Sequence, residues 1–156
     1  IFATINSTLE IDIFSDQHFM RQAYAEALKA FEEDEIPVGA VLVSRNRIIG
    51  RGYNQTEKLT DVTAHAEMLA ITAASGYLGS KYLRDCTLYV TLEPCPMCAG
   101  ALFWSQVSKV VYAAADLKRG FLEHGGSLHP KTKLVQGPME RESADLLREF
   151  FKKRRP

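Results

Sequence analysis

The chain has 156 residues, of which 46% are hydrophobic and 24% are charged, values ordinary for a single globular domain with one core. Lysine plus arginine and aspartate plus glutamate number 19 each, so the net charge gives no global electrostatic reason to expect a nucleic-acid partner. The longest apolar run, Val38–Val43, is far too short to span a bilayer, which predicts no membrane segment. Three cysteines, an odd number, argue against a disulfide framework and predict a reducing, cytoplasmic compartment.

The first expected element is a helix that begins after Ser15 and ends before Pro37, because proline excludes the residue before it from the helical region. Residues 1–14 precede this helix and are assigned to an N-terminal extension, and the domain is expected to span residues 15–156. An acidic run, residues 32–35, lies near the end of the helix and predicts a solvated surface.

The rest of the chain alternates between strand and helix patterns. The expected segments, in order, are a hairpin (38–43 and 48–54), a helix (64–74), a strand (87–92), a helix (96–104), a strand (109–115), a loop (116–130), a short strand (132–137) and a basic helix (142–155). The second helix is expected to stop near Gly76. Strands that alternate with helices after a hairpin predict an α/β fold, a three-layer α/β/α sandwich around a mixed five-stranded sheet.

Cys95 and Cys98 open one of these helices, and such a pair fits a redox dithiol, half of a structural zinc site or part of a catalytic metal centre. His65 and Glu67 open the preceding helix. Two thiolates and one imidazole suit zinc, and three protein ligands leave one position open, as in catalytic sites. We therefore expect one zinc ion per chain on His65, Cys95 and Cys98, with water as fourth ligand and Glu67 carrying its proton. Residues two apart point to different faces of a helix, so His65 and Glu67 must both lie at its first turn.

These segments carry a family resemblance. The sequences HAE and PCPMC match the H-x-E…P-C-x-x-C signature of zinc-dependent nucleobase deaminases. The blocks PVGAVLV, TAHAEMLAI, CTLYVTLEPCPMCAGAL, VVYAAAD and LLREFFKKRR are similar, in order and spacing, to the bacterial tRNA adenosine deaminases of the cytidine deaminase-like superfamily. The resemblance runs from about Phe19 to the end of the chain. It implies hydrolytic deamination of adenosine to inosine at the wobble position of a tRNA anticodon, with release of ammonia.

The same resemblance implies substrate-binding roles for residues beyond the metal ligands. It places Asn54 against the substrate sugar or base, and Ala66 along the pocket through its backbone. It places Glu93 and Pro94 at the floor of the pocket, and Asp116 beside the nucleotides that flank the target. It also implies a homodimer whose partner helps to bind RNA.

Clustered basic residues indicate where RNA would make contact. The tail 152–155 holds four cations in succession, and a looser group lies in the long loop. Such clusters near aromatic side chains are typical of nucleic-acid surfaces, and cations also favour the C-terminal end of a helix. The expected contacts with an anticodon stem-loop are Lys118, Arg119, Lys152, Lys153, Arg154 and Arg155.

A second branch of the superfamily fits the same motifs. The run EPCPMC followed by LFW is also similar to bacterial guanine deaminases, which act on a free purine base. In addition, the tRNA enzymes usually carry an Asn-His pair before the last strand, where this chain has LHPKTK. The chain length and the basic C-terminal helix favour the tRNA enzyme. The alternative function is deamination of a free purine base or nucleoside. A module that binds RNA without catalysis is a third hypothesis, and an intact Glu67 speaks against it.

Overall fold

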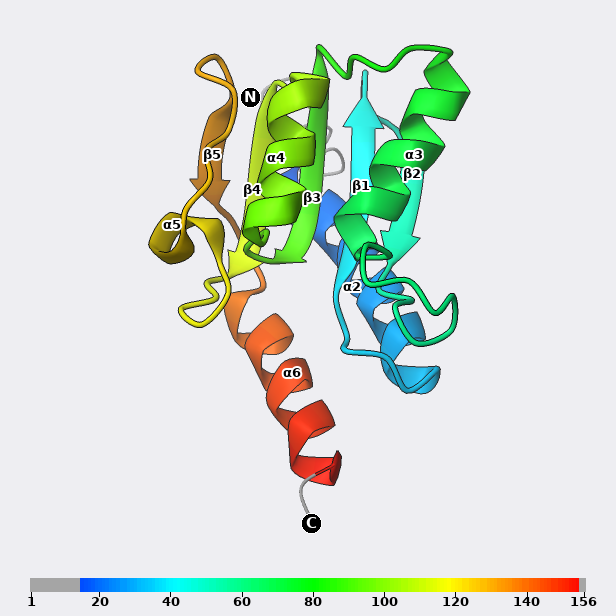
Figure 1. Cartoon of the computed structure of the whole chain (residues 1–156), viewed down its shortest axis with the longest axis vertical. Helices are drawn as coiled ribbons and strands as arrows, with labels where there is room; N and C mark the ends of the chain where they lie inside the picture. Colours follow the sequence, from blue (N-terminus) through cyan, green and yellow to red (C-terminus); the bar gives the residue numbers. More distant parts are fainter. Residues whose placement is uncertain (1–14, 155–156) are drawn as a thin grey trace, which may run out of the picture.

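Residues 15–154 are described by the computed structural model and form a five-stranded sheet with helices on both faces (Figure 1). The elements are α2 (Asp16–Glu32), β1 (Gly39–Ser44), β2 (Arg47–Tyr53), α3 (Ala66–Leu78), β3 (Cys86–Leu92), α4 (Pro96–Ser105), β4 (Lys109–Ala114), α5 (Phe121–His124), β5 (Lys133–Gln136) and α6 (Glu140–Arg154). The strand order is β2-β1-β3-β4-β5. Strand β1 is antiparallel to β2 and β3, whereas β3, β4 and β5 are parallel. The predicted α/β sandwich around a mixed sheet is confirmed.

Helices α3 and α4 cover one face of the sheet and α2 covers the other, while α6 extends past the ends of β3 and β4 (Figure 1). Alternate residues of β1 supply the two cores. Ala40 and Leu42 pack in the cluster that includes α3 and α4, and Val41 and Val43 pack in the cluster that includes α2. None of the helices among residues 15–154 has the length and apolar character needed to cross a membrane.

The helix ends test the predicted boundaries. The Ser15 hydroxyl accepts the N–H of His18 at 3.4 Å, so the predicted N-cap of α2 is confirmed. Helix α3 ends slightly beyond the predicted point near Gly76. The helix continues through Gly76 to Leu78, and Gly79, with a φ of 64°, forms the left-handed C-cap. An interior glycine costs a helix only about 0.5–1 kcal/mol, which is too little to end one that packs tightly on the sheet.

Two other segments differ from expectation. The loop 116–130 contains one helical turn, α5. The acidic run is not wholly solvated, because Glu35 is only 1% exposed. The predicted extension, residues 1–14, and the predicted RNA contact Arg155 lie outside the described residues.

Candidate metal centre

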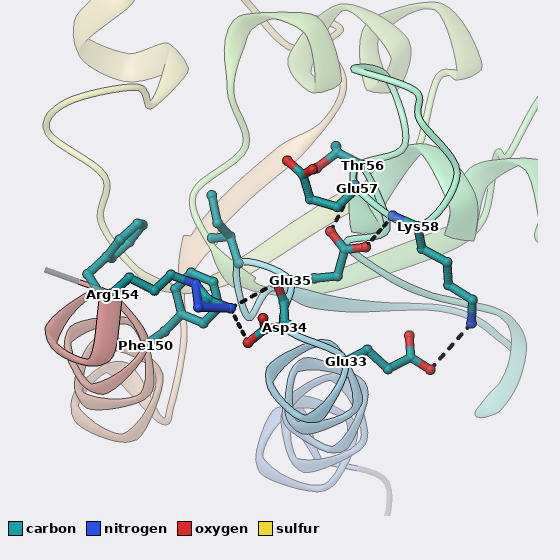
Figure 2. A pocket seen from close by; sticks show the side chains of 10 residues that line it. Glu33, Asp34, Glu35, Thr56, Glu57, Lys58, Phe150 and Arg154 are labelled. Atoms are coloured by element: carbon teal, nitrogen blue, oxygen red, sulfur yellow. Dashed lines mark hydrogen bonds and ion pairs between the residues drawn. The ribbon is translucent and has the colours of Figure 1, made fainter. Parts of the chain in front are cut away.

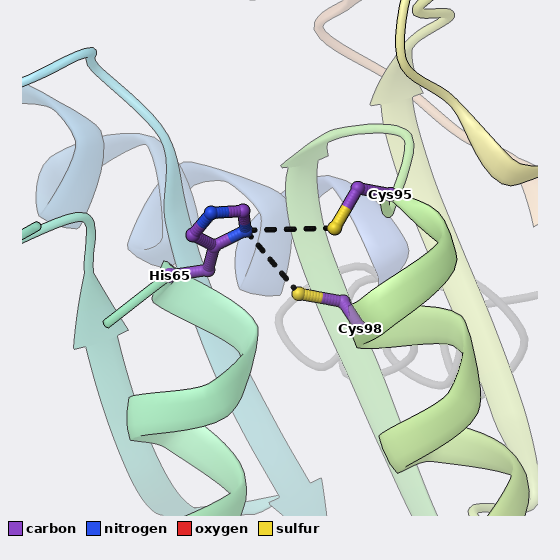
Figure 3. Close-up of side chains that lie close together, drawn as sticks. All are labelled: His65, Cys95 and Cys98. Atoms are coloured by element: carbon purple, nitrogen blue, oxygen red, sulfur yellow. Dashed lines mark hydrogen bonds between the residues drawn. The ribbon is translucent and has the colours of Figure 1, made fainter. Parts of the chain in front are cut away.

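Two helices begin side by side at one end of the sheet, and each brings predicted metal ligands to its first turn (Figure 3). His65 is the N-cap residue of α3. Cys95 is the N-cap residue of α4, Pro96 follows at the first helical position as predicted, and Cys98 lies in the first turn. Helix N-termini carry partial positive charge and free N–H groups, which stabilise thiolates. The local structure therefore favours the ionised form of Cys95, whereas the pKa of the Cys98 thiol is raised, chiefly by its hydrogen bond to Cys95.

The three donor atoms have the separation that zinc requires. His65 Nδ1 lies 3.6 Å from Cys95 Sγ and 3.5 Å from Cys98 Sγ, and all three atoms lie within 4.8 Å of one another (Figure 3). Zinc in tetrahedral geometry, with bonds of about 2.3 Å to sulfur and about 2.05 Å to nitrogen, holds such atoms about 3.6 Å apart. The predicted ligands are thus brought together in an arrangement that fits zinc without rearrangement.

Hydrogen bonds among these side chains set their protonation. The pKa of Cys95 is lowered to about 4, chiefly by a hydrogen bond from the Cys98 thiol and also by the His65 ring, against the opposing effect of burial. The pKa of His65 is raised, chiefly by its hydrogen bond to Cys95. Because the thiolate is the form that binds zinc, Cys95 is prepared for metal at neutral pH.

Glu67 lies in the first turn of α3, two residues after the N-cap residue His65, so the condition for both residues to serve one centre is met. Its side chain is 4% exposed. Burial raises the pKa of this carboxyl to about 7, against the opposing effects of its own backbone N–H and of His65. A carboxyl group with a pKa near neutrality can both accept and donate a proton.

A cavity of about 720 Å³ opens over this centre, a size within the range of roughly 300–1,000 Å³ that small-molecule sites occupy. Among the predicted substrate-binding and RNA-contact residues, those that line it are Asn54, Ala66, Glu93, Asp116, Lys118, Arg119 and Arg154. Within residues 15–154, the remaining ones, Pro94, Lys152 and Lys153, are not among the lining residues. Its wall therefore combines the carboxyl of Glu67 with cations from two separate segments.

Two residues predicted to bind substrate, Asn54 and Pro94, already form hydrogen bonds within the protein. The Asn54 amide donates to the carbonyl of Ile36 at 3.2 Å and accepts the N–H of Thr56 at 3.3 Å. The carbonyl of Pro94 accepts the N–H of Phe121 at 2.9 Å. These bonds fix the positions of two loops that border the cavity.

The basic tail is partly tied to the end of α2. The Arg154 guanidinium forms an ion pair with the Asp34 carboxylate, donates to the Asp34 carbonyl at 3.1 Å and lies 3.9 Å from the centroid of the Phe150 ring (Figure 2). The Lys153 ammonium lies 5.0 Å from the centroid of the Phe31 ring. Half of the four tail cations therefore hold α6 in place, whatever else they contact.

A second cavity of about 950 Å³ adjoins the first (Figure 2). The two share Ile36, Phe151 and Arg154, which we call the shared wall.

The sequence did not single out Leu147 or Phe151, although both line the cavity over the metal centre, which we call the metal cavity. Their i, i+4 spacing places them on one face of a helix, and this was the available signal.

Comparison with known proteins identifies the class to which this fold and donor set belong. Residues 14–114 match the family model of the cytidine and deoxycytidylate deaminase zinc-binding region. The chain therefore belongs to the cytidine and deoxycytidylate deaminase family, and the predicted resemblance is confirmed.

Three individual proteins illustrate this similarity. The tRNA-specific adenosine deaminase of Aquifex aeolicus (strain VF5) is 45% identical over 150 residues, covering 89% of this chain and 95% of that protein. A structure from studies of A-to-I editing by tRNA:A34 deaminases superposes with a TM-score of 0.78 at 42% identity, covering 83% of this chain and 99% of that one. A guanine deaminase from Bacillus subtilis is 42% identical, with a TM-score of 0.61 and 64% of each chain covered.

Proposed function

We propose that the chain is a zinc-dependent hydrolytic deaminase that converts adenosine to inosine at the wobble position of a tRNA anticodon. The cavity carries this proposal, because it joins a three-ligand metal site to the buried Glu67 and to cations on its wall, Lys118, Arg119 and Arg154. Anticodon-loop bases are unpaired and enter a pocket at modest cost, while cations attract the flanking phosphates. Relatives named for this activity share 44–45% of aligned residues with the chain.

The chemistry divides between the metal and the protein. Zinc on His65, Cys95 and Cys98 would supply Lewis-acid activation of a water molecule near neutral pH. Glu67 accepts a proton from the attacking water and delivers it to the purine nitrogen beside the carbon that carries the exocyclic amine. The same carboxyl then takes the remaining proton from the hydroxyl group added to that carbon and passes it to the amine, the carbon–nitrogen bond breaks, and water and adenosine yield inosine and ammonia.

Other residues bind and orient the substrate. Asn54 faces the cavity with its amide fixed at both ends and contacts the sugar or base, and Ala66 borders the base through its backbone. Asp116, at the start of the loop on the opposite wall, contacts the nucleotides that flank the target.

The proposal includes the organisation of the whole protein. Residues 15–156 constitute the deaminase domain, residues 1–14 are an extension, and the enzyme acts in the cytoplasm as a homodimer. A second copy fits against α4, where a Cβ on Gly100 would meet no neighbour within 4 Å and Trp104, one turn further along, is 76% exposed.

One observation favours a second candidate, deamination of a free purine base. The guanine deaminase from Bacillus subtilis is as similar in sequence as the tRNA:A34 deaminase structure, although it covers a smaller part of the chain. A free base would occupy the metal cavity without needing the cations on its wall.

Ammonia release separates the candidates. One zinc-loaded preparation receives an anticodon stem-loop with adenosine at the wobble position, free guanine, adenosine and cytidine in parallel. We expect the stem-loop to react by far the fastest, and the same stem-loop with guanosine at the wobble position serves as the matched control. Turnover of guanine without turnover of the stem-loop would overturn the tRNA assignment.

A further inference from the structure

We propose that Glu93 is a positioning residue, whose carboxylate holds the loop 116–122 so that Lys118 and Arg119 stay at the wall of the metal cavity. Its effect on RNA binding rests on the proposed function, whereas its effect on the loop does not. The resemblance of the chain to known deaminases placed Glu93 at the floor of the pocket. Glu93 lines the metal cavity, and its side-chain contacts also tie it to the loop.

A single carboxylate holds both ends of this loop. Glu93 is 4% exposed, and its Oε1 accepts the N–H of Asp116 at 3.1 Å while its Oε2 accepts the N–H of Leu122 at 3.1 Å. Its own N–H donates to the carbonyl of Ala114 at 2.8 Å, which fixes its backbone against the end of β4. Both oxygens are thus directed to backbone N–H groups of one loop.

Gly120 makes this contact possible. A Cβ at Gly120 would overlap the Glu93 carboxylate and the carbonyl of Asp116. The N–H of Gly120 donates to that same Asp116 carbonyl at 2.8 Å, so the loop closes tightly around the carboxylate. A larger residue here would push the loop away from Glu93.

The loop in turn fixes the backbone positions from which the side chains of Lys118 and Arg119 extend. Asp116 Oδ1 accepts the N–H groups of Lys118 at 3.2 Å and Arg119 at 3.1 Å, which forms a compact turn. All three residues line the metal cavity. Because Glu93 lies two residues before the metal ligand Cys95, one short segment positions both the metal centre and its cationic wall.

Glutamine is a sharp test of this role, since it keeps the shape of glutamate but has one carbonyl oxygen and one NH₂ group. Two N–H donors then compete for one acceptor, and one of them faces another donor. Gly120→Ala disturbs the same contact from the loop side and leaves the charge of Glu93 intact. Glu26→Gln is the matched control, because Glu26 is also buried, at 2% exposed, and forms ion pairs with Lys29 and Arg51 on α2 and β2.

Hydrogen exchange of the zinc-loaded protein without RNA tests the loop directly. In Glu93→Gln we expect protection of the Asp116 and Leu122 amides to fall about tenfold or more, the loss that follows from removing a buried hydrogen bond to a charged group. Zinc content stays at that of the parent. Protection at both amides equal to that in Glu26→Gln would overturn the proposal.

RNA binding tests the consequence. In a Glu67→Ala background, an anticodon stem-loop is titrated at several salt concentrations. We expect Glu93→Gln to weaken binding and to flatten the slope of log K against log salt by about 0.7–0.9 for each phosphate that Lys118 or Arg119 no longer neutralises. Gly120→Ala should do the same, and the double variant should lose little more than either single one. Unchanged affinity and slope in both variants would overturn the role in RNA binding.

Failure of the Glu67→Ala parent itself to bind the stem-loop would count against the proposed function, while the exchange experiment would still decide the role of Glu93.

Discussion

Two buried glutamates lie in the adjoining cavities on either side of the shared wall, and their surroundings differ. Glu35, in the second cavity, is 1% exposed, and its two oxygens accept the N–H groups of Glu57 at 3.0 Å and Lys58 at 2.8 Å (Figure 2). Glu67, in the metal cavity, is 4% exposed and lies beside the metal ligand His65. Residue type and burial are the same, so neither property explains why Glu67 and not Glu35 is proposed to carry a proton.

The partners of the carboxylate make the difference. Backbone N–H groups on both oxygens satisfy the Glu35 carboxylate and make it part of the fold. The Glu67 carboxyl faces a cavity, and the loss of water raises its pKa to about 7. A buried carboxylate that lines a cavity is therefore a structural tie when backbone N–H groups of a loop occupy both of its oxygens, and a candidate for proton transfer when they do not.

Changing Glu67 has the largest expected effect and tests one side of this comparison. In Glu67→Gln, kcat should fall about 10²–10⁴-fold, the range that a positioned acid–base group contributes. Zinc content should stay at one per chain, because three other residues supply the protein ligands. The free energy of unfolding should not decrease, since an amide costs less to bury than a carboxylate. Single-turnover ammonia release, metal analysis and urea unfolding measure the three quantities. Loss of zinc would mean that Glu67 is itself a ligand.

Changing Glu35 should give the opposite result. In Glu35→Gln, one of the two N–H groups at residues 57 and 58 loses its acceptor, and the free energy of unfolding should fall by about 1–3 kcal/mol. Most of kcat should remain, because the contacts of Glu35 lie in the second cavity. The same unfolding and turnover assays serve both variants. A fall in kcat as large as that in Glu67→Gln would mean that burial matters more than the partners, and the comparison would fail.

Most of the fold could be predicted because its signals are local. Alternation of apolar residues marked the strands, and Ser15, Pro37 and Pro96 marked helix ends by their own backbone chemistry. The end of α3 could not be predicted in this way. Gly76 and Gly79 are similar local signals, and the helix ends where Gly79 adopts a left-handed φ of 64°.

The metal centre was also predictable, since zinc restricts both the types of its ligands and their spacing along the chain. Glu35 was not, because a run of four acidic residues resembles a solvated surface. Its N–H partners come from a loop 22 and 23 residues further along the chain. The contacts of Lys153 with Phe31 and of Arg154 with Asp34 could not be predicted for the same reason, because these partners are remote in sequence, and RNA binding by the two cations stays a prediction.

Breaking the ion pair between Asp34 and Arg154 should have the smallest effect on the free energy of unfolding, although Arg154 is part of the shared wall (Figure 2). The two side chains are 84% and 34% exposed, and exposed pairs contribute about 0–1 kcal/mol. Asp34→Asn should therefore lower the free energy of unfolding by less than about 1 kcal/mol, and salt should remove the difference because it screens exposed charges. Arg154 keeps its bond to the Asp34 carbonyl and its contact with Phe150 in this variant, which limits the effect further.

A double-mutant cycle with Arg154→Gln, measured by urea unfolding at low and high salt, isolates the coupling between the two charges. A coupling as large as the cost of Glu35→Gln that persists in high salt would contradict this prediction. The exposed ion pair would then be the main interaction that stabilises the shared wall. A small coupling that salt removes would leave Arg154 held mainly by its bond to the Asp34 carbonyl and its contact with the Phe150 ring, neither of which depends on the Asp34 charge.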